Sequence, residues 1–281
     1  MQIGKVEIHL LTDGIASTDG GGMFGVVPKV MWERRHPADE SNRILMRINS
    51  LLIEDGEYII LVDTGFGSKM NQRAMKVLGI KETGLLPERL RERGLEPSDI
   101  NLVINTHLHF DHNGGNTTLS GDRLTPTFPN ATYIVQHGEW DNATNPNERT
   151  KASYLPENLL AIREAGLLEL IEGNTQITPH VQCILTPGHT PWHQSILIES
   201  DGVKALYLGD LACFAVHMER LPWVAAYDLE PVRTIETKKW VQNWVVQEQI
   251  LAVFPHDPEV DAGYLTKLPT GGYQLNGVLC A

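Results

Sequence analysis

Residues 105–116 read Asn-Thr-His-Leu-His-Phe-Asp-His-Asn-Gly-Gly-Asn, with three imidazoles and one carboxylate in six consecutive positions. The preceding run 100–104 is short, mostly apolar and bounded by polar residues, which predicts a buried strand. The cluster then lies on the loop that leaves this strand. Imidazole nitrogens and carboxylate oxygens together suit zinc, iron, manganese or cobalt better than calcium or magnesium. The stretch therefore predicts a transition-metal site without the thiolates of a structural zinc site.

The four groups at this spacing do not converge easily on one ion. His107 and His109 stand two positions apart and can reach one point, whereas Asp111 and His112 more naturally face a second point. Each ion is then short of ligands, and strand-end loops are where further functional groups are expected. Three later loops of this kind offer one candidate each, namely His189 in a Pro-Gly turn, Asp210, and His256.

This ordered set resembles the metallo-β-lactamase superfamily, and the resemblance extends from Asp63 to His256. It implies the α/β (α+β) fold of that family, a four-layer αβ/βα sandwich, which strand-rich halves with interspersed helices also fit. It also implies two divalent transition-metal ions, zinc first, with iron, cobalt and manganese as alternatives. The implied ligands are His107, His109 and His189 for the first metal, Asp111, His112 and His256 for the second, and Asp210 as the bridge between them.

Two further polar residues are candidates for an outer role around the metals. Asp63 ends an apolar strand, where it can cap a turn or, as the resemblance implies, orient a ligand histidine. His193 follows His189 by four residues and is a candidate for the same kind of role.

The bulk properties limit the class of protein. A chain of 281 residues with 42% hydrophobic content fits one large domain, residues 1–281, better than two small ones. The net charge of -12 argues against nucleic acid and an anionic membrane as partners. Cys183, Cys213 and Cys280 lie far apart without a CxxC pair, which predicts reduced thiols and a cytoplasmic protein. We find neither a signal-peptide pattern nor a segment long enough to span a bilayer.

Apolar patterns predict the remaining elements. We expect strands at 44–53, 58–63 and 131–135, three consecutive strands between 181 and 208, and a terminal hairpin over 264–275. We expect helices at 71–78, 87–93, 156–165 and 231–250, and a surface loop at 141–151. An apolar stripe on the last helix is expected to face the core, and it consists of Val232, Ile235, Trp240, Trp244, Val245 and Ile250.

Residues 13–36 form a glycine-rich apolar arm after a first strand that we expect to end near Leu11. The arm is either a loop folded over its own core or a flap or dimer contact, since exposed apolar clusters often mark contact sites. The run 17–29 resembles the YtnP-like quorum-quenching lactonases. From the arm and from these relatives we expect a homodimer.

Seven residues are candidates for contact with substrate: Met23, Phe24, Cys213, His217, Met218, Trp223 and Tyr227. Those at 217–227 follow Asp210, where the chain has to pass the metals. Lactonases of this superfamily often place a tyrosine three residues after the bridging aspartate, where this chain has Cys213. At that point the chain is similar to the methyl parathion hydrolase branch.

The resemblance implies hydrolysis by a hydroxide that bridges the two metals, with Asp111 and Asp210 as catalytic carboxylates. Two small-molecule substrate classes remain open: N-acyl homoserine lactones, with apolar residues accepting the acyl chain, and organophosphate triesters or aryl esters. A redox-active di-iron protein is a more remote alternative, because such relatives carry a flavin domain for which no residues remain. A site that only stabilises the fold would be expected to use thiolates.

Overall fold

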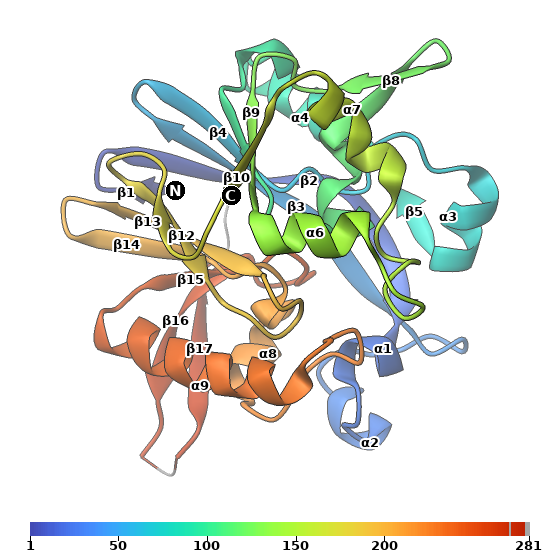
Figure 1. Cartoon of the computed structure of the whole chain (residues 1–281). Coiled ribbons are helices and arrows are strands. Elements are labelled where there is room, and N and C mark those ends of the chain that lie inside the picture. Colours follow the sequence, from blue (N-terminus) through green and yellow to red (C-terminus); the bar gives the residue numbers. More distant parts are fainter. Residues whose placement is uncertain (270, 279–281) are drawn as a thin grey trace.

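Two β-sheets pack face to face in the computed structural model of the chain, which describes residues 1–269 and 271–278 (Figure 1). The first sheet has the order β1-β2-β3-β4-β6-β9-β10, with β5 paired to β2. Its strands are β1 (Gln2–Ile3), β2 (Val6–Asp19), β3 (Arg43–Asp55), β4 (Tyr58–Val62), β5 (Ile80–Glu82), β6 (Leu102–Ile104), β9 (Thr132–Gln136) and β10 (Leu168–Ile171).

The second sheet runs in chain order from β11 to β17. Its strands are β11 (Thr175–Gln176), β12 (Val181–Leu185), β13 (Gln194–Ser200), β14 (Val203–Tyr207), β15 (Leu251–Val253), β16 (Ala262–Lys267) and β17 (Tyr273–Val278). A separate hairpin consists of β7 (Thr117–Ser120) and β8 (Arg123–Pro126).

Helices connect and cover these sheets. They are α1 (Gly20–Phe24), α2 (Lys29–Trp32), α3 (Gln72–Leu78), α4 (Leu86–Glu92), α5 (Phe110–Asn113), α6 (His137–Thr144), α7 (Leu160–Glu164), α8 (Ala215–Glu219) and α9 (Pro231–Gln247). Short 3-10 turns lie at Pro97–Asp99, Gly114–Asn116, Pro156–Asn158 and Gly209–Ala212.

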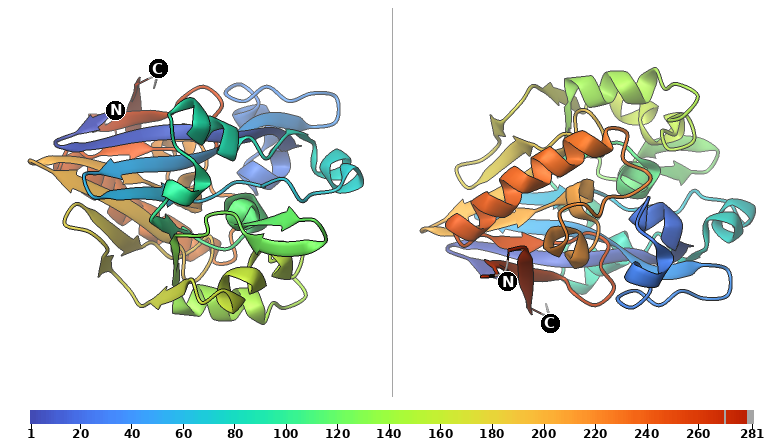
Figure 2. Two further views of the ribbon diagram at one scale, coloured as in Figure 1. Left: turned by 90° about the horizontal axis from the view of Figure 1, so that it is seen from above. Right: turned by 90° about the horizontal axis from the view of Figure 1, so that it is seen from below.

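The largest apolar cluster lies between the two sheets. Ile53 and Val62 of the first sheet belong to the same buried cluster as Ile196 and Val253 of the second. Helices α4, α6 and α7 are buried against the outer face of the first sheet, and α8 and α9 against the outer face of the second. Figure 2 shows α9 lying across its sheet. The order helix, sheet, sheet, helix confirms the predicted four-layer αβ/βα sandwich.

Parallel strands bring several loops to one edge of the sandwich. β6 is parallel to β4 and β9, and β15 is parallel to β14. The carboxyl ends of neighbouring parallel strands meet at the same edge of a sheet. The turn between β12 and β13 reaches this edge too, because Ile196 near the start of β13 pairs with Tyr207 at the end of β14. The loops after β6, β12, β14 and β15 therefore converge.

Most of the predicted elements are confirmed. The hairpin β3–β4, the three strands β12–β14, the terminal hairpin β16–β17 and the helices α3 and α4 lie where the apolar patterns place them. The helix expected at 156–165 is a 3-10 turn followed by α7.

The loop predicted from Asp13 onward was wrong over much of its length. β2 continues to Asp19 and remains paired with β3, with an irregularity in register between Thr12 and Gly14. Asp19 then caps α1 by accepting a hydrogen bond from the Gly22 N–H at 3.0 Å. Pairing with β3 overrides the weak strand propensity of this polar, glycine-containing segment.

The surface loop predicted at 141–151 was wrong at its start, because residues 141–144 are the last turn of α6. The stripe predicted on α9 was also partly wrong. Val232 is 70% exposed and Trp240 is 47% exposed, whereas Lys238 and Gln242 are buried. The two polar side chains turn inward because they donate hydrogen bonds to main-chain carbonyls of the segment 218–223.

Two findings concern the class of protein. Among the helices described, none has the length and apolarity needed to cross a membrane. Cys183 and Cys213 are buried free thiols, and Cys280 lies outside the described residues.

Candidate metal centre

The seven predicted ligand side chains meet at the edge where the four loops converge. His107 and His109 lie on the loop between β6 and α5, and Asp111 and His112 lie in α5 itself. The remaining three come from the second sheet: His189 from the turn after β12, Asp210 from the 3-10 turn after β14, and His256 from the loop after β15. Residues up to 149 positions apart in the sequence thus share one site.

His107, His109 and His189 form a first triangle. One ligand nitrogen from each lies within 4.8 Å of the other two. The Nδ1 atom of His109 is 3.0 Å from the Nε2 atom of His189. All three side chains are buried.

Asp111, His112 and His256 form a second triangle. The Nε2 atoms of His112 and His256 are 3.1 Å apart. The Oδ2 atom of Asp111 lies 3.8 Å from the first of these nitrogens and 3.9 Å from the second. Three donor atoms therefore face one point here as well.

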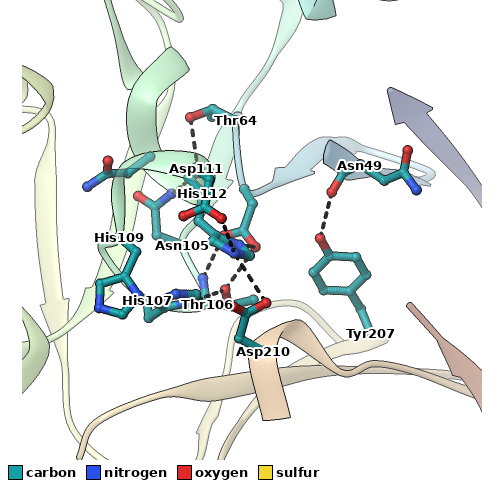
Figure 3. A network of polar contacts seen from close by, with 12 residues as sticks. Asn49, Thr64, Asn105, Thr106, His107, His109, Asp111, His112, Tyr207 and Asp210 are labelled. Carbon is teal, nitrogen blue, oxygen red and sulfur yellow. Dashed lines mark hydrogen bonds and ion pairs between the residues drawn. The ribbon is translucent and has the colours of Figure 1, made fainter. Parts of the chain in front are cut away.

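Asp210 contacts members of both triangles, and Figure 3 shows it beside His107 and His112. Its Oδ2 atom is 3.3 Å from Nε2 of His189, a member of the first triangle. Its Oδ1 atom is 3.3 Å from Nε2 of His112 and 3.1 Å from Nε2 of His256, both in the second. One carboxylate thus presents an oxygen to each triangle.

Hydrogen bonds at the outer nitrogens fix two of the rings that come from the first sheet, those of His107 and His112. His112 donates through Nδ1 to Asp63 at 2.8 Å, and the Thr106 hydroxyl also donates to Asp63. The same hydroxyl is 3.1 Å from Nδ1 of His107. Asp63 adopts a left-handed backbone with φ of 57°, a strained conformation typical of functional sites. These bonds direct the Nε2 atoms of His107 and His112 toward the centre.

The rings from the second sheet are fixed in the same way. His189 donates through Nδ1 to Asp228 at 2.8 Å, and His256 donates through Nδ1 to the main-chain carbonyl of Arg47 at 2.8 Å. Sequence reasoning missed Asp228, because no ligand spacing connects it to His189, which lies 39 positions earlier. Its contact depends on the course of the loop before α9.

His193 lies behind the site rather than in it. Its Nε2 atom accepts a hydrogen bond from the main-chain N–H of Asp210 at 3.0 Å, and burial lowers the pKa of His193 to about 3. The neutral ring is close to Gly209, where a Cβ would lie 2.6 Å from Nε2. Glycine is therefore required at 209 for the ring to hold the turn that carries Asp210.

The donor set fits metal ions better than a hydrogen-bond network. Nε2 of His107 is buried and has no hydrogen-bond partner among the described residues. His112 and His256 each donate through Nδ1, so in their neutral forms the two rings would turn Nε2 lone pairs toward each other at 3.1 Å. Lone pairs this close repel unless a cation lies between them. Imidazole with carboxylate is a donor mixture that zinc and related ions accept.

The electrostatics of the site agree with this assignment. Burial and the neighbouring imidazoles hold the pKa of His107 well below its ordinary value, which keeps its ring neutral. Burial opposes a charge on His112, yet Asp210, Asp111 and Asp63 hold the pKa of His112 well above its ordinary value. The carboxylates around His112 thus attract positive charge to that half of the site.

A cavity of about 390 Å³ opens onto the centre. Its floor is formed by His109, Asp111, His189, Asp210 and His256, and its apolar walls include Met23, Met46, Phe66, Leu78, Phe110 and Leu229. Arg149 and Tyr227 add polar groups to the lining. The cavity is therefore a mostly apolar pocket with charged groups at one end, as expected for an amphipathic small molecule.

The structure places two of the seven predicted pocket residues, Met23 and Tyr227, in the lining of this cavity. Tyr227 lies against α1, where a Cβ on Gly22 would be 2.3 Å from its hydroxyl. The other five are buried behind the wall, in clusters with α1, α2 and α9: Phe24, Cys213, His217, Met218 and Trp223. Phe24 was predicted to touch substrate because it lies in the arm, but its ring packs into the core. The other four were predicted because they follow Asp210, but that segment turns into the core through α8.

Cys213 takes no part in the cavity lining described above. Burial and the nearby Asp210 carboxylate hold the pKa of Cys213 well above its ordinary value. The thiol is therefore protonated and packs with Phe214 and Val216.

Comparisons with known proteins agree with this geometry. A model of the Metallo-beta-lactamase superfamily matches residues 44–241. An N-acyl homoserine lactonase of Bacillus sp is 33% identical over 223 residues, which are 75% of this chain and 82% of the relative. A probable metal-dependent hydrolase from Staphylococcus aureus has a TM-score of 0.91 and 32% identity, with 100% of both chains covered. AidC, a dizinc quorum-quenching lactonase in complex with a product, shares the fold with a TM-score of 0.83 and 22% identity over 100% of this chain and 97% of that one.

Proposed function

Because the chain belongs to the metallo-beta-lactamase superfamily of hydrolases, we propose that it opens the ring of N-acyl homoserine lactones with the help of two divalent metal ions. The observation that carries this proposal is the position of Asp210, whose two oxygens face two separate triangles of metal-binding groups. The lactonase relative supports the choice of substrate class.

Each triangle would hold one ion. His107, His109 and His189 would bind the first, Asp111, His112 and His256 the second, and Asp210 would bridge them. Zinc is the ion we propose first, and iron, cobalt or manganese would accept the same donors. When bound, such ions lower the pKa of a coordinated water and polarise the bond to be attacked.

The protein's own groups would then position the substrate and move the proton. The carboxylate of Asp111 lines the cavity and is partly exposed, so we assign it the transfer of the proton from the attacking water toward the leaving alkoxide. Asp210 lies on the same floor and would balance the charge of both ions. Because the lactone is opened by water, no covalent bond to the protein is needed.

The walls of the cavity suit an acyl chain. Met23, Met46, Phe66 and Phe110 present apolar surface beside the floor, and burial of each methylene of a substrate chain contributes about 0.8 kcal/mol. The guanidinium of Arg149 is held by the carbonyls of Ala226 and Asp228, so it can offer its remaining N–H groups to a substrate amide.

Rates of hydrolysis of N-decanoyl homoserine lactone and of paraoxon by one zinc-reconstituted preparation test the substrate class. We expect a kcat/KM for the lactone at least tenfold above that for paraoxon, and we expect the D210N variant to lose turnover. Lactone opening no faster than in buffer would overturn the proposal. Paraoxon hydrolysis in that case would favour the phosphotriesterase alternative, which Cys213 in place of a tyrosine had kept open.

The arm at 13–36 supports a second proposal, that two copies of the chain associate. Trp32 and Phe24 are buried and stack at 5.1 Å, whereas Val26, Val30 and Met31 are exposed at 93%, 71% and 52%. Exposed apolar clusters of this kind usually mark contact sites. Light scattering of the whole chain tests this: we expect twice the mass of 31.3 kDa, and a species of 31.3 kDa alone would contradict a dimer.

A further inference from the structure

Glu139 is a fully buried carboxylate close to the metal centre, although it is not one of its ligands. It lies in the first turn of α6 and is 1% exposed. A buried carboxylate is unfavourable unless hydrogen bonds compensate for the loss of water. The groups that compensate Glu139 therefore indicate what it holds in place.

Three donors surround Glu139. Its Oε1 atom accepts from the main-chain N–H of Leu108 at 3.0 Å and from the hydroxyl of Tyr154 at 3.0 Å. Its Oε2 atom accepts from the hydroxyl of Thr190 at 2.7 Å. All three partners are buried with it. Burial raises the pKa of Glu139, whereas these three hydrogen bonds lower it and so favour the carboxylate form.

The partners of Glu139 sit directly beside the ligands of the first triangle. Leu108 lies between His107 and His109, and Thr190 follows His189. Tyr154 contributes as well, because its ring lies 5.1 Å from the ring of His109. Glu139 thus connects a loop of the first sheet with a turn of the second. No hydrogen bond described joins it to Asp111, His112 or His256.

A close contact one residue earlier supports this docking. A Cβ on Gly138 would lie 2.2 Å from the indole of Trp192, so glycine allows the turn 189–192 to lie directly on α6. Two neighbouring residues at the start of α6, Gly138 and Glu139, therefore contact this turn. Neither contact is needed to cover the sheet, since Trp140 and Ala143 of the same helix do that.

We propose that Glu139 is a positioning residue that fixes the three ligands of the first metal site by bonding to both segments that carry them. The proposal rests on the metal role assigned above to His107, His109 and His189. Without Glu139 the Leu108 N–H and the Thr190 hydroxyl lose their acceptor, and the two segments lose the hydrogen bonds that connect them directly beside the ligands. The second site keeps its own supports, Asp63 and the carbonyl of Arg47.

Stepwise zinc binding by the metal-free protein, measured by competition with a chromophoric chelator, tests this. The D111A variant lacks a ligand of the second site only. The zinc-binding constant that remains unchanged in this variant therefore belongs to the first site. We expect E139A to weaken the first-site constant 10- to 100-fold, the usual effect of removing an outer partner of a ligand. The second-site constant should change less than threefold.

E139Q is the matched variant, because the amide oxygen can still accept from Leu108 and Tyr154 while the Thr190 hydroxyl accepts from the amide N–H. We expect it to recover most of the first-site affinity. T190V removes only the Thr190 hydroxyl and should weaken the same constant in the same direction, which keeps the test valid if E139A does not fold.

D55N serves as the control for loss of a buried carboxylate. Asp55 accepts hydrogen bonds from Thr178 and His180, roughly 26 Å along β3 from Arg47. Unchanged zinc constants in both E139A and T190V would overturn the role of Glu139, as would equal weakening of both sites in E139A and D55N. Failure of the wild-type chain to bind two ions would instead remove the proposed metal site itself.

Discussion

At the scale of single residues, the orientation of each ligand imidazole from the second sheet depends on the group that accepts a hydrogen bond from its outer nitrogen. For His189 this group is the carboxylate of Asp228. In D228A the Nδ1–H of His189 is left without an acceptor and the ring can rotate. We predict a 10- to 100-fold loss of zinc affinity.

Chelator competition on the purified variant measures this loss. D228N is the matched variant, because its amide oxygen can still accept from His189. A D228A protein that binds zinc within twofold of the wild type would show that Asp228 does not orient the ring.

Lys238 is a second residue whose burial has a measurable consequence. Its ammonium donates to the carbonyls of Leu221 and Trp223, and burial lowers the pKa of Lys238 to about 7. Between pH 7 and the ordinary value of 10.5, the unfolded chain therefore binds more protons at this residue than the folded chain. The free energy of unfolding should rise with pH across this window, by at most about 1.4 kcal/mol per pH unit.

Urea unfolding at pH 7, 8.5 and 10 tests this contribution. We expect the wild type to gain stability relative to K238M as the pH rises, because methionine has no proton to lose. K239M carries the same change at the exposed neighbouring position and should follow the wild type. Parallel pH dependence in all three proteins would contradict a titrating Lys238.

At the scale of elements, α9 shows why periodicity alone misjudges a buried face. Its inward positions include Thr234, Lys238 and Gln242 beside Val241 and Val245. Lys238 and Gln242 are buried because they donate hydrogen bonds to main-chain carbonyls of the segment 218–223. A hydrophobicity pattern does not show that polar side chains bind carbonyls in the core. The predicted stripe therefore included Val232 and Trp240, which lie on the exposed face.

Two valines on α9 provide a direct comparison. Val245 is 1% exposed and Val232 is 70% exposed, so the same change to alanine should have different effects. We predict that V245A lowers the free energy of unfolding by about 2 kcal/mol, from lost transfer energy and a cavity. V232A should stay within about 0.5 kcal/mol of the wild type. Chemical denaturation measures both, and equal losses would contradict the observed orientation of the helix.

Strands with apolar runs or a clear alternation of apolar and polar residues could be predicted from the sequence, whereas the second half of β2 could not. Residues 13–19 are polar or small, and their strand structure comes from pairing with β3 rather than from their own preferences. The hairpin β3–β4 was predictable because Asp55-Gly56 supplies a turn between two apolar runs.

At the scale of the whole molecule, the sequence was enough to find the seven groups that meet at the centre, because their spacing and order resemble a known family. The pocket was less predictable. Its walls come from separate segments, such as Met23, Met46, Phe66, Leu78 and Tyr227, that share no pattern. Asp228 and Glu139 could not be predicted from the sequence either, because the hydrogen bonds that connect them to the ligand segments form only in the folded chain.

The fold also explains why both sheets are needed for one site. The first triangle takes two ligands from the first sheet and one from the second, and the second triangle does the same. Only the sandwich holds these groups together, so loss of the packing between the sheets would separate both sets of ligands. Asp210 then links two ions whose positions depend on the whole molecule.

The rate of opening of N-hexanoyl homoserine lactone, followed while zinc is added stepwise to the metal-free chain, tests the central claim most directly. We predict that the rate rises until two zinc ions per chain are present and is constant thereafter, and that D210N shows no such rise. A plateau at one ion per chain, or full turnover by the metal-free protein or by D210N, would contradict a pair of ions joined by Asp210.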